Sequence, residues 1–248
     1  MFYETLQDKL MELLQGNGLI DTEVTVETRA LKPREAIGNP DRDDFPLLKG
    51  REVLMQATFL NHRGQAFTDA PSAFRGTIRE IIEKRRVGPR EQARFIATLN
   101  AVVRHFYPDV PTIHCRDKGP ALCSREMAGF VGSLNMKTVG LLGLQPAILH
   151  ALVSEFGTEN VMCIDRDEDN RDIMKCGVPI RWGDRDGLDA LFVFGDVILA
   201  TGSSVANGTI VDILDMNRKY LKPLYFYGTT IAGPAYLMGL KHLCYQAS

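Results

Sequence analysis

The sequence predicts an α/β protein in two parts: an N-terminal α+β domain and a C-terminal Rossmann-like domain with a mostly parallel sheet. In the first part, strand-like stretches come early and amphipathic helical stretches follow them. In the second part, short apolar runs alternate with helical stretches, as in βαβ units. The predicted boundaries are 1–110 for the first domain, 111–134 for a linker and 135–248 for the second domain.

Apolar periodicity defines the elements of the first domain. Leucines at spacings of three and four predict the first helix, which ends at Gly16. Alternation of apolar and polar residues predicts the strands, with a turn at 62–64 before the third strand. In chain order we expect a helix over 2–16, strands over 22–30, 52–60 and 65–68, and helices over 74–82 and 89–106.

The second domain carries apolar runs that are typical of strands buried on both faces. We expect strands over 138–143, 161–165, 197–200 and 224–227. Gln145 and Pro146 open a helix after the first of these strands, and turns rich in Gly, Ser and Thr follow the last two. In such a sheet, ligands bind beyond the carboxyl ends of the strands.

The composition excludes several classes of protein. The 248 residues include 29 Lys and Arg against 31 Asp and Glu, a formal net charge of −2, which does not fit a nucleic-acid binder. No apolar run is long enough for a membrane span, and the start of the chain lacks the pattern of a signal peptide. Five scattered cysteines indicate free thiols, so we expect a cytoplasmic protein.

The first strand-to-helix turn is a candidate ligand site. Gly140 and Gly143 match part of a dinucleotide fingerprint, but Pro146 replaces its third glycine. Asp165 follows Gly143 by 22 positions, close to the offset at which an acidic residue binds a ribose. Gln145 and Asp165 are therefore candidate ligand-binding residues. The alternative is that Asp165 only caps its neighbours at the end of a strand.

The turns after the last two strands form a second candidate. We predict that they lie side by side at one edge of a pocket and bind an anionic or nucleotide-like ligand. The alternative is that Gly and Thr serve only as turn and cap residues, and Thr209 with Asp212 fits a capping box. The candidate residues are Thr201, Gly202, Ser203, Asn207, Gly208, Thr209, Thr229 and Thr230.

The linker carries candidate ligands for a transition or heavy metal ion. His114, Cys115 and Cys123 lie within ten positions, in a segment with three prolines that we do not expect to be helical. Their spacing is not that of a zinc finger, so any other ligands must come from elsewhere in the fold. The alternative is that they are two ordinary cysteines and a loop histidine.

The polar loop over 38–46 is a further candidate binding site. It combines Pro and Gly with three carboxylates and an arginine. We predict that Asn39, Arg42 and Asp43 face the same cleft from the first domain, because a polar loop held in one shape is often a binding loop. The alternative is a solvated turn.

Several of these motifs resemble the heavy-metal chelation domain family, a prokaryotic family of largely undetermined function. They are residues 36–46 (AIGNPDRDDFP), 64–71 (GQAFTDAP), 112–115 (TIHC), 143–147 (GLQPA), 200–209 (ATGSSVANGT) and 227–233 (YGTTIAG). The resemblance implies an enolase N-terminal-like fold for residues 1–110, a Rossmann-like fold for 135–248 and a ligand cleft between them.

Three functions are open at this stage. The first is binding of a heavy or transition metal, or of an anionic metal chelate, in the cleft. The second is an enzyme that uses a nucleotide-like or S-adenosylmethionine-like cofactor, with Asp165 on the ribose. The third is a partner-binding module without a small ligand. The sequence assigns no catalytic residue, and it leaves open whether the protein forms a homo-oligomer.

Overall fold

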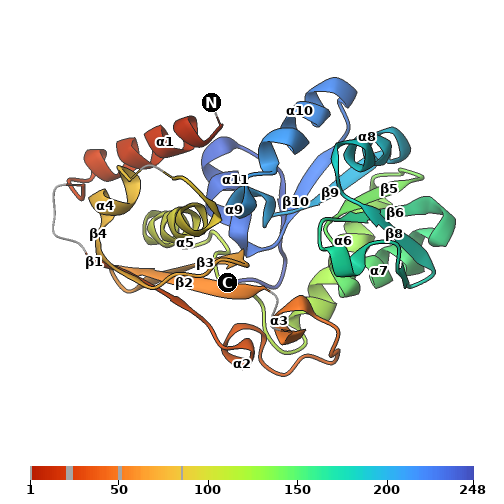
Figure 1. Ribbon diagram of the computed structural model, residues 1–248, viewed down its shortest axis with the longest axis horizontal. Helices are drawn as coiled ribbons and strands as arrows, with labels where there is room; N and C mark the ends of the chain where they lie inside the picture. The colour runs from red at the N-terminus through yellow and green to blue at the C-terminus, as the bar shows by residue number, and fades with distance from the viewer. Residues whose placement is uncertain (1, 21–24, 50–51, 85) are drawn as a thin grey trace.

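The computed structural model describes residues 2–20, 25–49, 52–84 and 86–248. These residues form two sheets, with helices packed on both (Figure 1). One is a four-stranded antiparallel sheet in the order β3-β2-β1-β4, and the other has seven strands in the order β11-β10-β9-β5-β6-β8-β7. No helix of the described residues is long and apolar enough to cross a membrane.

The first half is built around one long helix. Its elements are α1 (Phe2–Gly16), β1 (Thr25–Ala30), α2 (Pro33–Ile37), α3 (Pro46–Lys49), β2 (Val53–Phe59), β3 (His62–Thr68), β4 (Phe74–Thr77), α4 (Ile78–Ile82) and α5 (Pro89–Phe106). Helix α5 lies between the four-stranded sheet and the pair α1 and α4 (Figure 1). A side chain at Gly64 of β3 would overlap the backbone of Ala97 and Ala101, so glycine lets α5 pack directly on the sheet.

Two expectations for this half are wrong. The hairpin between β2 and β3 turns at Leu60 and Asn61, where both residues have positive φ, and not at 62–64. Phe74 belongs to β4 and not to the following helix, because Thr77 caps α4 through a hydrogen bond from the Glu80 N–H.

The second half confirms the Rossmann-like fold. Its elements are β5 (Val139–Leu142), α7 (Pro146–Phe156), η1 (Thr158–Asn160), β6 (Val161–Asp165), η2 (Glu168–Asn170), β7 (Met174–Lys175), β8 (Val178–Trp182), α8 (Arg185–Phe194), β9 (Val197–Thr201), α9 (Ser204–Asn207), α10 (Ile210–Tyr220), β10 (Leu224–Tyr227), η3 (Thr229–Ile231), α11 (Ala232–Met238) and β11 (His242–Leu243). All neighbouring strands are parallel except the β7–β8 hairpin. Counted along the chain, the parallel strands have the order 3-2-1-4-5-6 of the doubly wound fold.

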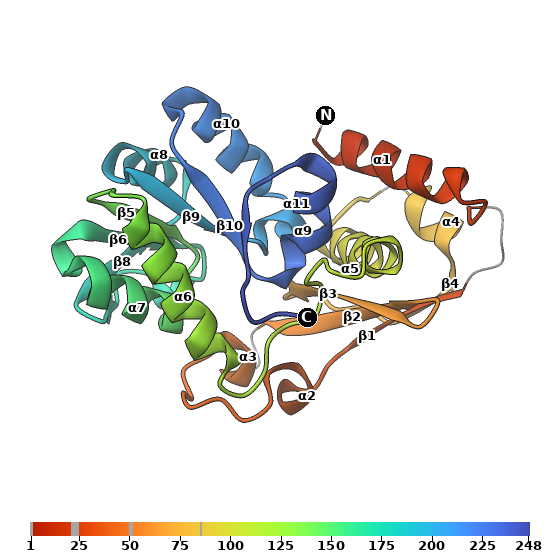
Figure 2. The ribbon, with the colours of Figure 1, turned by 180° about the vertical axis from the view of Figure 1, so that it is seen from behind.

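The linker is partly helical, contrary to expectation. Helix α6 spans Gly119–Ser133, with Pro120 in its first turn, where the missing N–H of proline costs no hydrogen bond. It packs beside α7 on one face of the parallel sheet (Figure 2). The residues before α6 are not helical, and Ile113 exchanges two backbone hydrogen bonds with Ser248 at the end of the chain.

The two halves share one hydrophobic core. Helix α5 of the first half contacts η3 and α11 of the second half. At this junction the Nδ2 group of buried Asn100 donates to the carbonyl oxygens of Gln65 at 2.8 Å and of Thr230 at 3.0 Å. Its Oδ1 accepts from the Gly233 N–H at 2.8 Å. Asn100 therefore joins β3 to η3 and α11, and it fixes the halves relative to each other.

Candidate functional site

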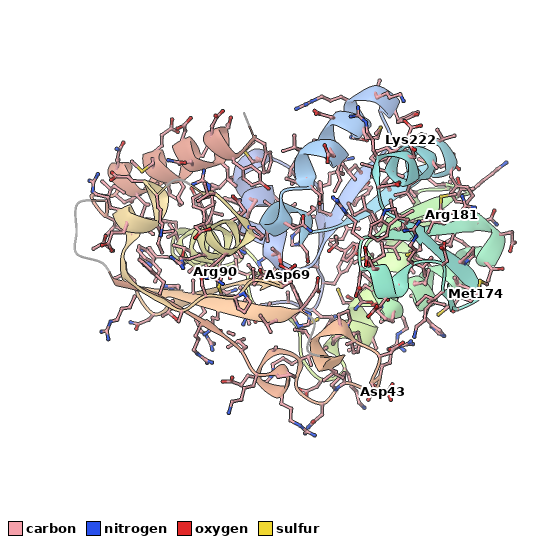
Figure 3. All side chains as sticks on the ribbon, in the orientation of Figure 1. Asp43, Asp69, Arg90, Met174, Arg181 and Lys222 are labelled. Carbon is pink, nitrogen blue, oxygen red and sulfur yellow. The ribbon has the colours of Figure 1, made fainter. Side chains whose placement is uncertain are left out.

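A cavity of about 700 Å³ lies at the carboxyl ends of the parallel strands, between the two halves. Leu142, Gly143 and Leu144 at the end of β5, and Thr201 and Ser203 at the end of β9, contribute to its lining. These two strands are neighbours at the point where the strand order reverses, which is the usual ligand position in this fold. Asp69, which also lines the cavity, is labelled between the halves in Figure 3. We call this cavity the cleft.

Asp165 lies in the cleft, as its position in the sequence predicts, but its oxygens hold the neighbouring loops. Its Oδ2 accepts from the Leu144 N–H at 2.6 Å. Its Oδ1 accepts from the Asp167 N–H at 2.8 Å and from Asn170 Nδ2 at 3.1 Å. Gln145 also lines the cleft, and its Oε1 caps α7 by accepting from the Ile148 N–H at 2.8 Å. These bonds match the capping alternative more closely than a free ribose acceptor.

The turns after β9 and β10 lie side by side, as predicted. Thr201 pairs with Tyr227 across the two strands, and the Gly202 N–H donates to the Tyr227 carbonyl oxygen at 2.7 Å. Of the candidate residues in these turns, the cleft lining includes Thr201, Ser203, Asn207, Thr209 and Thr230. The remaining three, Gly202, Gly208 and Thr229, are not among the residues that line the cleft.

Two hydroxyl groups of these turns already bond within the protein. Thr230 Oγ1 accepts from the Phe67 N–H of β3 at 2.9 Å, which ties this turn to the first half. Thr209 Oγ1 donates to Asn207 Oδ1 at 2.8 Å and makes no capping bond to α10, so the expected capping box with Asp212 is wrong. These two hydroxyl groups therefore give little direct support for an anion site. The Oγ atoms of Ser204 and Thr229 are buried and have no hydrogen-bond partner among the described residues.

The polar loop faces a different hollow. Asn39, Arg42 and Asp43 line a separate cavity of about 460 Å³ that shares no lining residue with the cleft. Asp43 is labelled at the periphery beside α3 in Figure 3. The prediction that these residues face the cleft is therefore wrong.

Ion pairs explain the position of this loop. Both carboxylate oxygens of Asp44 accept from Arg42 at 2.9 Å, and Oδ2 also contacts Lys175 Nζ of β7 at 2.7 Å. The Arg42 hydrogen bond is the main cause that holds the pKa of Asp44 well below its usual range. These contacts turn the loop toward β7, and they leave Arg42 paired within the protein.

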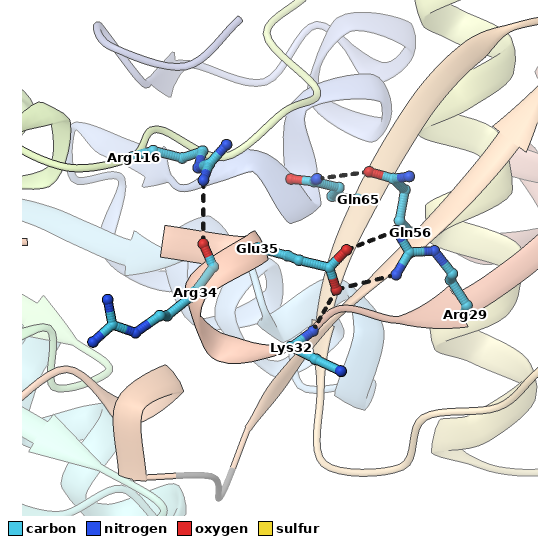
Figure 4. A network of polar contacts seen from close by, with 7 residues as sticks. All are labelled: Arg29, Lys32, Arg34, Glu35, Gln56, Gln65 and Arg116. Atoms are coloured by element: carbon cyan, nitrogen blue, oxygen red, sulfur yellow. Dashed lines mark hydrogen bonds and ion pairs between the residues drawn. The ribbon is translucent and has the colours of Figure 1, made fainter. Parts of the chain in front are cut away.

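Polar contacts hold the linker against the first half (Figure 4). Arg116 donates to the Arg34 carbonyl oxygen of α2 at 3.2 Å. Gln65 Nε2 donates to Gln56 Oε1 at 3.1 Å, and Gln65 Oε1 accepts from the His114 N–H at 2.7 Å. This buried pair of glutamines places His114 and the next residue, Cys115, at the cleft.

Three cysteines line the cleft: Cys115 from the linker, Cys123 from α6 and Cys244 from the segment after β11. We call them the thiol cluster. All three are free thiols. A hydrogen bond from Cys244 lowers the pKa of Cys123 to about 7, with further donation from the backbone N–H groups of Tyr245 and Gln246. Burial raises the pKa of Cys115 to about 12, so Cys123 is the thiolate of the cluster.

His114 joins this side of the cleft but does not complete a metal site. Burial lowers the pKa of its imidazole to about 4, so the ring is neutral at physiological pH. Its Nδ1 has no hydrogen-bond partner in the part of the chain that the structure describes. Within those same residues, no three His, Cys, Asp or Glu side chains are grouped so that they could hold a metal ion together. The thiol cluster is therefore not a closed three-ligand site.

Four carboxyl groups form a second cluster in the cleft lining: Glu52 before β2, Asp69 after β3, Asp165 at the end of β6 and Asp167 beyond it. We call them the carboxyl cluster. Burial is the main cause that raises the pKa of Glu52 to about 7, and the charges of Asp165, Asp69 and Asp167 add to it. Sequence reasoning missed both Glu52 and Cys244, because neither belongs to a motif or a recognisable spacing.

The fold and the cleft define a Rossmann-like α/β protein with a cavity between its two halves. Among solved structures, the chain is similar to a protein of unknown function from the DUF364 family of Pyrococcus horikoshii. The two share 16% sequence identity with a TM-score of 0.57, over 93% of this chain and 80% of that one. A DUF364 protein of unknown function from Desulfitobacterium hafniense matches at 14% identity and a TM-score of 0.45, over 75% and 73% of the two chains.

The structural similarity to the Pyrococcus protein confirms the predicted α/β fold. No family model matches the chain, and no curated protein matches it. Neither of the matched structures is described as binding a heavy metal, so the matches do not support the name of the family that the sequence resembles. Functional argument must therefore start from the residues that line the cleft.

Proposed function

We propose that the protein binds a soft metal ion, or a chelate of one, in the cleft through the thiol cluster. The observation that carries this proposal is the convergence of three free cysteines from three separate segments on one cavity. Thiolates are the ligands that soft metals select. Cys123 supplies a thiolate near neutral pH without a metal, because Cys244 and two backbone N–H groups stabilise its charge.

A chelate fits the cleft better than a bare ion. Since the described residues offer no ready group of three ligands, part of the coordination must come from a bound small molecule or from movement of the thiols. The cavity of about 700 Å³ has room for such a molecule, since typical small-molecule pockets measure about 300–1,000 Å³. The neutral imidazole of His114 is a further nitrogen donor in the lining.

Titration with Cd²⁺ tests this proposal, because Cd²⁺ bound to thiolate has a charge-transfer band in the near ultraviolet. We expect the triple variant Cys115→Ser, Cys123→Ser, Cys244→Ser to lose about 100-fold or more in Cd²⁺ affinity. The double variant Cys115→Ser, Cys123→Ser should already lose most of the Cd²⁺ affinity.

Cys176→Ser is the matched control, because Cys176 is also a free cysteine but does not line the cleft. It should leave the affinity unchanged, and circular dichroism should show the native fold in every variant. Cd²⁺ binding that persists in the triple variant, or that disappears in the control, contradicts the proposal.

A cofactor-dependent enzyme is the second candidate, and the strand order supports it, because the cleft lies where doubly wound folds bind nucleotides. The charge of the cleft weakens the case for a phosphate-bearing ligand. Among the residues that the structure describes, the lining includes one guanidinium group, that of Arg166, and six carboxyl groups: Glu52, Asp69, Asp165, Asp167, Glu168 and Asp169. Of the two cofactor types, S-adenosylmethionine, whose sulfonium is cationic, suits this lining better than a nucleotide.

Thermal unfolding with ADP and with S-adenosylmethionine separates the two candidates. A ligand at 100 times its dissociation constant adds about 2.7 kcal/mol to the free energy of unfolding. We expect neither compound to raise the unfolding temperature if the cleft serves a metal chelate. A clear rise with S-adenosylmethionine alone would support the enzyme instead.

A further inference from the structure

Two histidines outside the cleft lie with their rings in contact, where the end of α5 meets the β2–β3 hairpin. His62 is the first residue of β3, directly after the turn at Leu60 and Asn61, and His105 lies in the last turn of α5. Their Nδ1 atoms are 3.2 Å apart, and their ring centroids are 4.8 Å apart. Neither histidine lines the cleft, so the pair is separate from the thiol cluster.

The surrounding structure holds the two rings in this arrangement. Phe59 pairs with His62 across the hairpin, and its ring meets the ring of His105 edge-on, with 5.6 Å between the centroids. Phe106, the last residue of α5, contacts the His105 ring in the same way at 4.8 Å. Both histidines remain partly accessible to solvent. The pair is therefore positioned by its neighbours and open to an ion from solution.

The protons of the pair cannot satisfy all the polar atoms that meet there. The Leu60 carbonyl oxygen lies 2.9 Å from His62 Nδ1, in addition to the 3.2 Å contact of that nitrogen with His105 Nδ1. If His62 Nδ1 carries a proton, the carbonyl oxygen and the other nitrogen compete for it. If His105 Nδ1 carries the proton, two lone pairs face each other between His62 and Leu60. A cation that accepts an electron pair from each of the three atoms removes this conflict.

We propose that His62 and His105 bind Zn²⁺ through their Nδ1 atoms, with the Leu60 carbonyl oxygen as the third ligand and water in the fourth position. Two Zn–N bonds of about 2.0–2.1 Å at the tetrahedral angle place the two nitrogens about 3.3 Å apart. The observed separation of 3.2 Å already matches this geometry. Imidazole is a ligand that suits Zn²⁺, and each ring keeps a proton on its second nitrogen, Nε2.

The proposed ligand set differs from that of the thiol cluster. Two of the ligands are side chains and the third is a backbone oxygen, which agrees with the absence, among the described residues, of three His, Cys, Asp or Glu grouped for a metal ion. Two imidazole nitrogens suit Zn²⁺ but not Ca²⁺, which takes about six to eight oxygen ligands. The site should therefore discriminate between these two ions.

Nitrogen-15 NMR of the imidazole rings tests the proposal, because coordination shifts the signal of the nitrogen that binds the metal. The chain has five histidines, few enough to be followed ring by ring. On titration with Zn²⁺, we expect the Nδ1 signals of His62 and His105 to move together with one midpoint, and Ca²⁺ should leave both unchanged. These signals report the two rings directly, so Zn²⁺ bound at the thiol cluster does not affect the result.

The variants His62→Gln and His105→Gln each remove one proposed ligand. Each should lower the Zn²⁺ affinity measured at the remaining ring at least about tenfold. His150→Gln, at an exposed histidine on α7, is the matched control and should leave the midpoint at His62 and His105 unchanged. Circular dichroism and thermal unfolding establish that all three variants fold.

Three outcomes would overturn the inference: Zn²⁺ moves the signals of neither ring, Zn²⁺ moves only one of them, or His105→Gln leaves the midpoint at His62 unchanged. The first result would identify a hydrogen-bonded pair that binds no metal. The other two would identify binding by a single histidine. Any of these results with intact Cd²⁺ binding at the thiol cluster would reject this inference and leave the proposed function standing.

Discussion

The thiol cluster and the carboxyl cluster line the same cleft but are built in different ways. The carboxyl cluster comes from residues next to strands β2, β3 and β6, so the registers of the two sheets position most of it. The thiol cluster joins a linker residue, a helical residue and Cys244 near the end of the chain. The thiol cluster forms only when the segment after β11, which carries Cys244, has packed against the linker and α6.

The two clusters also tune their central groups in opposite directions. In the thiol cluster, hydrogen bonds bring the pKa of Cys123 down from 9.0 to about 7. In the carboxyl cluster, burial and like charges bring the pKa of Glu52 up from 4.5 to about 7. Both groups thus titrate near neutral pH, Cys123 because its charged form is stabilised and Glu52 because its charged form is not.

The largest effect should come from Asn100, which joins the two halves on either side of the cleft. Asn100→Leu removes the bonds to Gln65, Thr230 and Gly233 and leaves their buried backbone groups unpaired. Gln65 in turn holds His114 beside the thiol cluster. We expect the free energy of unfolding to fall by about 4 kcal/mol, at 1–3 kcal/mol for each unpaired group.

Urea denaturation measures this change. Asn17→Leu, directly after α1, is the control, because its side chain is exposed and donates to the Leu13 carbonyl oxygen of the adjacent helix. It should change the stability by less than about 1 kcal/mol. If Asn100→Leu also lowered the free energy of unfolding by less than about 1 kcal/mol, apolar packing and not this amide would join the two halves.

The second prediction separates the clusters through pH. Glu52 has a pKa of about 7 in the folded protein against 4.5 in an unfolded chain, so the folded state holds its proton more tightly. Binding of this proton stabilises the folded state. The stabilisation is fully present below about pH 4.5 and is lost as the pH rises to about 7. Glu52→Gln should therefore stabilise the fold by about 3 kcal/mol above neutral pH and by almost nothing near pH 4.

Chemical denaturation across this pH range measures the effect, with Glu12→Gln as the matched control. The gain should be absent from the control at every pH, because Glu12 is exposed. If Glu52→Gln were neutral or destabilising above pH 7, a protein group would have to stabilise the charged carboxylate, and burial would not control the pKa of Glu52.

The strongest sequence patterns predicted the fold well. Helices α1, α5 and α7 and strands β5, β6, β9 and β10 follow directly from apolar spacing, because each buries one face or both. The same patterns placed the β9 and β10 turns beside each other at the cleft. They could not show α6 as a helix, because prolines in its approach suggest a loop while Pro120 in fact occupies a tolerated first-turn position.

The site was predictable only where it coincides with strand ends or short spacings. Cys115 and Cys123 stood out because they are close in sequence, whereas Cys244 joins them only through docking of the last segment. The polar loop was misplaced because Lys175, which attracts Asp44, lies in a different half. No sequence pattern marks Glu52, because its raised pKa comes from burial and from carboxylates that other segments supply.

The smallest effect concerns the hydrogen bond within the thiol cluster. Cys244→Ala removes the S–H donor that is the main cause of the low pKa of Cys123. The pKa of Cys123 should then rise toward its ordinary value, and alkylation of Cys123 by iodoacetamide at pH 7 should slow by up to about tenfold, since the thiolate is the reactive form. Peptide mass spectrometry gives the rate at this cysteine.

Cys244→Ser keeps a hydrogen-bond donor and should retain fast alkylation of Cys123, and Cys176→Ala should have no effect on that rate. Equal rates in Cys244→Ala and the unmodified protein would show that the backbone N–H groups of Tyr245 and Gln246 stabilise the thiolate without Cys244.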